Sequence, residues 1–358
     1  MKDGTAPSCQ RPIHRRPIAR GGVPSVPSPC RDDSHFAAST FDIAIVTPFG
    51  FLNCDKPSGI TSRDLVNIVQ RRFGGRKGGV KVGHAGTLDP LAGGVLVVAL
   101  GPAVRLVPFL QEAEKRYAAS FRLGVCSDSG DIEQPLREVS GGAVPTETEL
   151  RAAAESLTGE IEQTPPAYSA VWIDGRRAYE RARQGERVKM PSRRVRVDEF
   201  SIRRYDYPAV DVGIVCGSGT YVRSLGIDLA ARCGTGAVMT ALVREAVGPF
   251  RLDEAVSIET LREASLGPLL RPPLFGVPHL PRLRLGDEAL WRLSNGQRVG
   301  VDEAGAGDPG GGSGDTGGSG QGGAARVVAV IDRQRRLRAI ARREGSSWRP
   351  YRVFPSPD

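Results

Sequence analysis

The sequence predicts an α+β fold, in which a mixed, mainly antiparallel sheet is flanked by helices and a small β-rich domain follows. Three observations lead to this prediction. Expected strands outnumber expected helices, and strands are joined both directly and through helices. Prolines cluster at Pro272–Pro281, where we place a domain boundary. With 358 residues, of which 40% are hydrophobic, the chain is long enough for two domains and a sizeable core.

The first expected elements flank a glycine-rich segment. A strand is expected within residues 49–59, where an apolar run ends in a Pro-Ser-Gly turn. A helix follows within 61–75, because Thr61 and Asp64 have capping-box spacing and apolar residues then fall on one face. The nearly apolar run at 93–101 predicts a buried strand, and the alternating run at 115–125 predicts another strand.

Later elements continue the alternation of strands and helices. A second capping box, Thr146 with Glu149, opens a helix expected within 145–159. The remaining elements are strands at 193–205 and 210–219, a helix at 220–234, an amphipathic segment at 286–299, and strands at 325–332 and 337–344. We therefore divide the chain into a disordered, basic and proline-rich extension at 1–45, a large domain at 46–275, and a small domain at 280–358. A disordered glycine-rich loop at 302–323 interrupts the small domain.

The charge of the chain favours nucleic acid as a partner. The formal net charge is +9, and the segment 176–205 holds eleven Lys or Arg against four acidic residues, with tyrosines between them. Basic side chains neutralise phosphates, and aromatic rings stack on bases. The alternative is a protein that is basic without binding nucleic acid. The four histidines are far apart and the six cysteines form no CxxC pair, so we expect reduced thiols and no metal site.

The segment "GHAGTLDPLAGG" (83–94) has the composition of a functional loop. Its glycines permit close approach of another molecule, and Pro90 biases Asp89 toward an extended backbone. An aspartate before a proline is most often a turn residue. The dense glycines, the nearby His84 and the basic chain elsewhere favour a site that receives a polyanion.

Six blocks, in this order, resemble the bacterial TruB-type tRNA pseudouridine synthases. They are "DKPSGITS" (55–62), "GHAGTLDPLAGGVLVVALG" (83–101), "KRYAASFRLG" (115–124), "PPAYSAVWIDGRRAYERAR" (165–183), "GSGTYVRSLGIDLA" (217–230) and "ALVREAVGPF" (241–250). The resemblance implies an isomerase that flips uridine 55 out of the T-loop of tRNA and converts it to pseudouridine without a cofactor or metal. It also implies that 46–275 is the catalytic domain and that 280–358 is a PUA-like RNA-binding domain.

The resemblance implies three catalytic residues: Asp89, Tyr117 and Arg223. Asp89 would be the catalytic aspartate, acting covalently at C1′ or at the base, or assisting formation of a glycal intermediate; these routes stay open. Arg223 would pair with Asp89 and keep it ionised. Tyr117 would stack on the flipped uracil and assist removal of the proton from C5. Without the resemblance, Tyr117 reads as a half-buried strand residue and Arg223 as a surface or phosphate-contacting arginine.

Six further residues are implied to bind the RNA: His84, Lys56, Tyr221, Leu242, Tyr179 and Arg183. His84 would fill the space that the flipped base leaves, and Lys56 would support the catalytic loop. Tyr179 and Arg183 lie in the block implied to touch the T-arm. This block departs from the family at Trp172, which stands where a lysine is expected. An indole can still stack on RNA, although one charge is missing.

The resemblance leaves three rivals to weigh. A dyskerin-type, guide-RNA-dependent synthase carries "DPK" where this chain has "DPL" (89–91). A non-catalytic tRNA-binding or folding chaperone could use the same scaffold. A metal-dependent nuclease would need acidic residues at metal-ligand spacing. We expect a cytoplasmic monomer that binds tRNA at its T-arm and elbow, without an obligate protein partner, signal peptide or membrane association.

Overall fold

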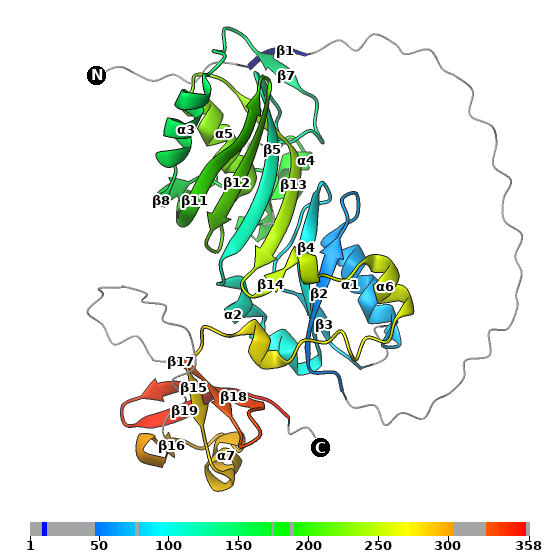
Figure 1. Ribbon diagram of the computed structural model, residues 1–358, viewed down its shortest axis with the longest axis vertical. Coiled ribbons are helices and arrows are strands. Elements are labelled where there is room, and N and C mark those ends of the chain that lie inside the picture. The colour runs from blue at the N-terminus through cyan, green and yellow to red at the C-terminus, as the bar shows by residue number, and fades with distance from the viewer. Residues whose placement is uncertain are drawn as a thin grey trace, which may run out of the picture.

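The computed structural model describes residues 9–12, 47–75, 79–169, 171–173, 175–186, 190–303 and 327–355. Its centre is a nine-stranded sheet with the order β2-β4-β13-β5-β12-β11-β8, to which β3 adds beside β4 and β14 beside β13 (Figure 1). The strands are β2 (Gly50–Lys56), β3 (Val82–His84), β4 (Ala92–Leu100), β5 (Lys115–Leu123), β8 (Gly159–Gln163), β11 (Arg193–Asp206), β12 (Ala209–Cys216), β13 (Ala237–Val247) and β14 (Phe250–Arg251).

The sheet is mixed because one pair of neighbours is parallel. β4 and β13 run parallel, with Leu242 opposite Ala92 and Arg244 opposite Gly94. The other neighbours in this sheet are antiparallel. The predicted fold class, a mixed and mainly antiparallel sheet with flanking helices, is confirmed.

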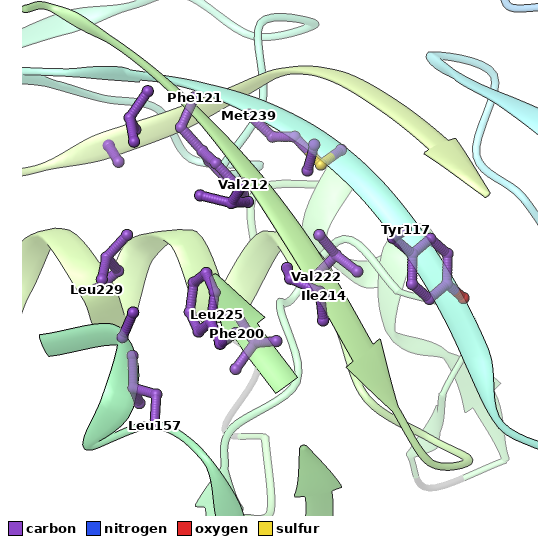
Figure 2. Packing of buried hydrophobic residues seen from close by; sticks show 14 of the residues in the cluster. Tyr117, Phe121, Leu157, Phe200, Val212, Ile214, Val222, Leu225, Leu229 and Met239 are labelled. Carbon is purple, nitrogen blue, oxygen red and sulfur yellow. The ribbon is translucent and has the colours of Figure 1, made fainter. Parts of the chain in front are cut away.

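Two groups of helices cover different halves of the sheet (Figure 1). Helices α3 (Glu147–Glu155) and α5 (Val222–Arg232) pack on β5, β11, β12 and β13 through a core that includes Phe121, Leu225 and Leu229 (Figure 2). Helices α1 (Ser62–Arg71) and α6 (Ile258–Glu263) pack on β2 and β4. Tyr117 lies at the edge of the first core, with its hydroxyl pointing away from the other labelled side chains (Figure 2).

Both predicted capping boxes form. The Thr61 hydroxyl accepts from the Asp64 amide at 3.1 Å, and the Thr61 amide donates to the Asp64 carboxylate at 2.9 Å. Thr146 and Glu149 make the same two bonds at 3.3 and 2.7 Å. Each box satisfies amides that a helix otherwise leaves without a partner, so the start of each helix could be predicted from the sequence.

A five-stranded sheet, ordered β15-β17-β18-β19-β16, forms the C-terminal domain with helix α7. Its elements are β15 (Arg282–Arg284), α7 (Asp287–Ser294), β16 (Val299–Gly300), β17 (Val327–Ile331), β18 (Leu337–Glu344) and β19 (Ser347–Val353). The domain shares a hydrophobic core with the large domain, in which the rings of Phe49 and Phe354 stack at 5.1 Å. Phe109 meets Tyr351 edge-to-face at 6.3 Å.

Short elements complete the described chain. They are η2 (Gly101–Leu106), α2 (Val107–Gln111), β6 (Val125–Cys126), β7 (Arg137–Val139), β9 (Trp172–Ile173), β10 (Arg176–Arg177), α4 (Ala178–Arg183), η3 (Leu252–Glu254), η4 (Pro273–Gly276) and η5 (Val301–Glu303). In the described ranges, no helix has the length and apolar character to cross a membrane.

Several features depart from the sequence-based expectations. Strands β13 and β19 were not expected, and the helix expected at 145–159 ends at Glu155. Residues 9–12 form a strand, β1 (Cys9–Pro12), paired with β7, within the predicted disordered extension. Cys126 is disulfide-bonded, so the expectation of six reduced thiols is wrong there. The other residues of 1–45, and 304–323 of the predicted loop, lie outside the described residues.

Candidate active site

Two neighbouring cavities contain most of the predicted site residues. The first has a volume of about 370 Å³ and is lined by five of them: Asp89, Tyr117, Tyr221, Arg223 and Leu242. The second has a volume of about 440 Å³ and is lined by His84, Tyr179 and Arg183. Asp89 and Arg223 line both cavities, so they form part of the wall between them. Lys56 lines neither.

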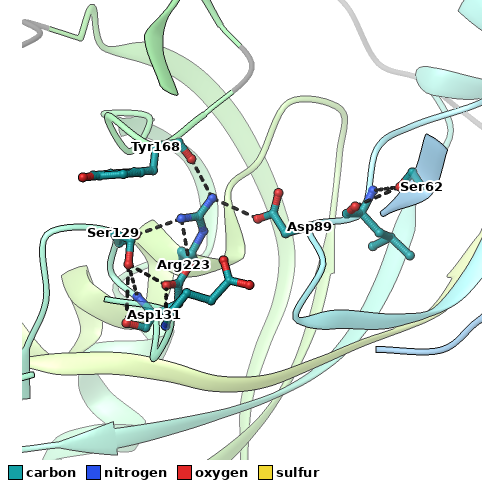
Figure 3. A network of polar contacts seen from close by, with 8 residues as sticks. Ser62, Asp89, Ser129, Asp131, Tyr168 and Arg223 are labelled. Atoms are coloured by element: carbon teal, nitrogen blue, oxygen red, sulfur yellow. Dashed lines mark hydrogen bonds and ion pairs between the residues drawn. The ribbon is translucent and has the colours of Figure 1, made fainter. Parts of the chain in front are cut away.

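Short hydrogen bonds fix the loop that carries Asp89. The Ser62 hydroxyl, at the start of α1, donates to the carbonyl of Leu88, and the Leu88 amide lies 2.8 Å from the same hydroxyl (Figure 3). On the other side, the Pro90 carbonyl accepts from the Gly59 amide at 2.7 Å. The loop is therefore fastened on both sides of Asp89, whose side chain remains 44% exposed.

Arg223 holds the Asp89 carboxylate from within the protein. Its Nη2 donates to Asp89 Oδ2 at 2.9 Å and to the Tyr168 carbonyl at 2.8 Å (Figure 3). Its Nη1 donates to Asp131 Oδ2 at 3.0 Å and to the Ser129 carbonyl at 2.8 Å. The Arg223 side chain is only 6% exposed, so four acceptors fix the guanidinium where water does not compete.

Asp131 is the buried end of this network, with a side chain that is 3% exposed. Its Oδ1 accepts from the Ser129 hydroxyl at 2.5 Å and from the Glu133 amide at 3.1 Å, while its Oδ2 accepts from Arg223. Both carboxylate oxygens are thus used. The result is a chain of charges, Asp131–Arg223–Asp89, in which only the side chain of the last member is substantially exposed.

Three residues of the adjacent strands β5 and β13 also line the first cavity. Tyr117 on β5 pairs with Arg244 on β13, and Leu242 lies two residues before Arg244. Arg244 is 3% exposed, and its guanidinium donates to the Val95 carbonyl at 2.8 Å and the Gly86 carbonyl at 3.1 Å. Burial raises the pKa of the Tyr117 phenol, although the charge of Arg244 acts against this. Tyr117 therefore presents a neutral ring beside the apolar Leu242.

Lys56 is fully buried next to the loop that carries Asp89. Its ammonium donates to the Ala92 carbonyl at 2.6 Å and to the Pro57 carbonyl at 2.9 Å. Burial lowers the pKa of Lys56 to about 8, while the charge of Asp89 acts to raise it. Lys56 thus ties the end of β2 to the start of β4, the strand that follows Asp89.

The histidine and aromatic residues differ in their surroundings. Burial and the charge of Arg244 lower the pKa of His84, which favours a neutral ring. The guanidinium of Arg193 lies over the Tyr221 ring at 4.8 Å, and that of Arg183 over the Tyr179 ring at 5.6 Å. Such cation–π contacts hold each ring in place and set a positive charge against it.

Two buried charges of the site, Asp131 and Arg244, were not predicted from the sequence. Asp131 stands in "SDSGD" (127–131), where closely spaced acids beside a glycine gave a signal that was not used. Arg244 stands among apolar residues in "ALVREAV" (241–247), and an arginine inside such a run indicates a buried charge. Within the described ranges, no group of three or more His, Cys, Asp or Glu side chains could hold a metal ion.

Comparison with known proteins identifies relatives over most of the chain. A sequence profile described as "TruB family pseudouridylate synthase (N terminal domain)" matches residues 71–222. The tRNA pseudouridine synthase B of Rhodopirellula baltica is 39% identical over 344 residues, which cover 87% of this chain and 96% of the relative. That of Dehalococcoides mccartyi is 36% identical and covers 86% of this chain and 97% of the relative.

Solved structures with a similar fold include complexes of the protein Cbf5. The crystal structure of a Cbf5-Nop10-Gar1 complex matches with a TM-score of 0.66 and 25% identity, over 87% of this chain and 86% of that chain. An archaeal box H/ACA sRNP Nop10-Cbf5 complex matches with a TM-score of 0.63 and 24% identity, and thus supports the fold alone. The two tRNA pseudouridine synthases B are more similar in sequence to this chain, at 39% and 36% identity, than the two Cbf5 chains, at 25% and 24%.

Proposed function

Because the chain belongs to the TruB family of pseudouridylate synthases, we propose that it converts uridine 55 in the T-loop of tRNA to pseudouridine. The coarser statement, that it is an isomerase forming pseudouridine in tRNA, follows from its relatives. The position, uridine 55, is what the family resemblance implies, and one observation carries the proposed chemistry. The Asp89 carboxylate is half-exposed at the wall between two cavities, while a buried arginine fixes its direction.

The reaction exchanges one bond to the ribose for another. The bond between C1′ and N1 breaks, the uracil turns, and C1′ bonds to C5. The proton leaves C5 and N1 gains a proton, so atoms and electrons balance without a redox partner. A carboxylate held beside C1′ can stabilise the developing positive charge of the sugar or bond to it. Asp89 fits this role because Arg223 orients one of its oxygens.

A uridine inside the T-loop must leave the stack before Asp89 can reach it, which costs a few kcal/mol. The first cavity offers what an extruded uracil needs, namely the Tyr117 ring and the apolar Leu242. Since burial keeps Tyr117 neutral, stacking is the role its surroundings support best. Transfer of the C5 proton to Tyr117 would require its phenolate form, which the charge of Arg244 favours.

The second cavity suits the RNA around the flipped nucleotide. Arg63, Arg177 and Arg183 line it with positive charge, beside the neutral His84. Arginines in such a groove contact phosphates, and an uncharged imidazole can occupy the gap that the base leaves. We therefore place the T-arm against this cavity and the flipped uridine in the first one.

The decisive test is tritium release from a T-arm stem–loop labelled at C5 of uridine 55, with EDTA and no cofactor. Wild type should release tritium and Asp89→Asn should release none, because an amide neither bonds to C1′ nor carries a charge. Asp253→Asn, which removes an exposed carboxylate outside both cavities, is the matched control. It should react like wild type.

The same assay separates the competing functions. A wild type that binds the stem–loop tightly without releasing tritium would favour a folding chaperone over a synthase. Release from a label at another uridine, and none from position 55, would keep the enzyme and overturn the position. Full activity of Asp89→Asn would remove Asp89 from the mechanism.

A further inference from the structure

We infer that Trp172 forms a stacking platform for an unpaired base of the substrate RNA, where its relatives are expected to use a charged contact. The inference rests on the proposed function and names a further contact at the same site. Trp172 is 63% exposed, so most of a large aromatic ring is available to a partner.

The hairpin that carries Trp172 is fastened to the active site. β9 pairs with β10, so that Trp172 lies opposite Arg177 and Ile173 opposite Arg176. The Ala178 amide donates to the Val171 carbonyl at 2.8 Å. In addition, the Tyr179 amide donates to the carbonyl of Ser169, a residue that lines both cavities, at 3.0 Å. Trp172 itself lines neither cavity, but its hairpin is held by backbone hydrogen bonds that reach Ser169 in the wall of both.

A cation on one face prepares the indole for stacking. The guanidinium of Arg177 lies over the Trp172 ring, 5.1 Å from its centroid, and Arg177 also lines the second cavity. The contact limits the rotation of the indole, while 63% of the residue remains open. A base that stacks on the ring would have the positive charge of Arg177 nearby, where its phosphate can use it.

The same arrangement recurs seven residues along the chain. The guanidinium of Arg183 lies over the Tyr179 ring, and both line the second cavity. Two arginine-backed rings on one hairpin and the following helix α4 are suited to single-stranded nucleic acid, where successive bases stack on aromatic side chains. A phosphate-binding lysine at position 172 would give affinity without this contact to a base.

Trp291 supplies a matched control. It is 64% exposed, nearly the same as Trp172, but it lies on α7 of the C-terminal domain, away from the hairpin and from α4. Trp291→Ala should therefore bind an isolated T-arm stem–loop like wild type. Trp172→Ala should bind it about tenfold more weakly, the scale of one lost base–aromatic stack.

Salt dependence separates stacking from charge. Trp172→Phe should retain most of the affinity, because a smaller ring still stacks. Trp172→Lys should recover affinity only at low salt and should steepen the plot of log affinity against log salt by about one unit, since it adds a phosphate contact. If Trp172→Ala itself flattens this plot without changing the affinity at high salt, the contact is not stacking.

Fluorescence and an abasic scan locate the stacked base. Stem–loop binding should quench the tryptophan fluorescence of wild type and of Trp291→Phe, but much less that of Trp172→Phe. Replacing loop nucleotides one at a time by abasic residues should reveal one position whose loss weakens wild type about tenfold and Trp172→Ala hardly at all. Additive losses at every position would overturn the inference.

These outcomes are distinct from failure of the proposed function. If uridine 55 is not the substrate, wild type releases no tritium in the assay with the stem–loop labelled at that position. If only the stacking inference is wrong, wild type and Trp291→Ala release tritium and Trp172→Ala binds as tightly as they do.

Discussion

Replacing Asp131 by asparagine tests whether the buried end of the charge chain controls the exposed end. The carboxylate uses Oδ1 to accept from Ser129 and Glu133, and Oδ2 to accept from Arg223. Asparagine keeps one oxygen and replaces the other by an NH₂ group. In either orientation that group faces an N–H donor, so Asp131→Asn cannot satisfy both sides.

The structure sets the size of the expected loss. A hydrogen bond to a charged group contributes about 1.5–3 kcal/mol, and Asp131 is almost fully buried, so the free energy of unfolding should fall by about 2 kcal/mol. Arg223 keeps Asp89 and two carbonyls as partners, which holds the loss below that of an unpaired buried charge. The guanidinium can then shift, and a misplacement of about 1 Å costs roughly 100-fold in rate.

Asp332→Asn is the matched control, because it perturbs a similar pair far from the site. Its side chain is also 3% exposed, and its two oxygens accept from the Arg336 amide and side chain at 2.8 and 3.0 Å. Both variants should lose stability in urea denaturation, but only Asp131→Asn should lose single-turnover tritium release. Equal activity of the two variants would refute the argument that Asp131 positions Arg223.

Two further predictions concern the support of the catalytic loop. Because burial lowers the pKa of Lys56 from 10.5 to about 8, the folded state binds fewer protons than the unfolded state between these values. The wild-type free energy of unfolding should therefore rise between pH 8 and 10.5 relative to that of Lys56→Met, by up to about 3 kcal/mol in urea titrations. Parallel pH profiles of the two proteins would contradict this. The second prediction is steric: Gly94→Ala should lower the melting temperature more than Gly59→Ala. Both have a similar positive φ, +94° and +91°, but a Cβ at Gly94 would lie 2.3 Å from the Arg244 carbonyl oxygen, whereas Gly59 faces open space; equal shifts would exclude a steric cause.

The sequence alone predicted the elements that have local signals. Helices α1 and α3 start where their capping boxes stand, and β4 and β5 follow the apolar and alternating runs. β13 was missed because its decisive feature is not local. It is the strand that pairs in parallel with β4 and antiparallel with β5, so its place in the sheet depends on partners more than 100 residues away.

The residues of the candidate site also fall into those with a local sequence signal and those that depend on remote partners. Asp89 could be selected from its own glycine-rich loop, and resemblance added Tyr117 and Arg223. The sequence signals of Asp131 and Arg244 do not reveal their roles, since an acid or an arginine is normally solvated and these two depend on burial beside particular partners. Their partners come from segments remote in the chain: Asp131 meets Arg223 of α5, and Arg244 meets the Gly86 and Val95 carbonyls.

The aromatic contacts between the two domains have a mechanical consequence. Phe354 and Tyr351 of the C-terminal domain insert their rings against Phe49 and Phe109, within one continuous core. These contacts oppose hinge motion between the two domains. For an RNA that contacts both domains, the distance between the two binding surfaces is then fixed before binding. Association therefore costs less conformational entropy than it would with a flexible linker. Replacing Phe354 by alanine would remove its ring contact with Phe49 and increase the flexibility between the domains. The affinity for RNAs long enough to reach both domains should then fall more than the affinity for short RNAs.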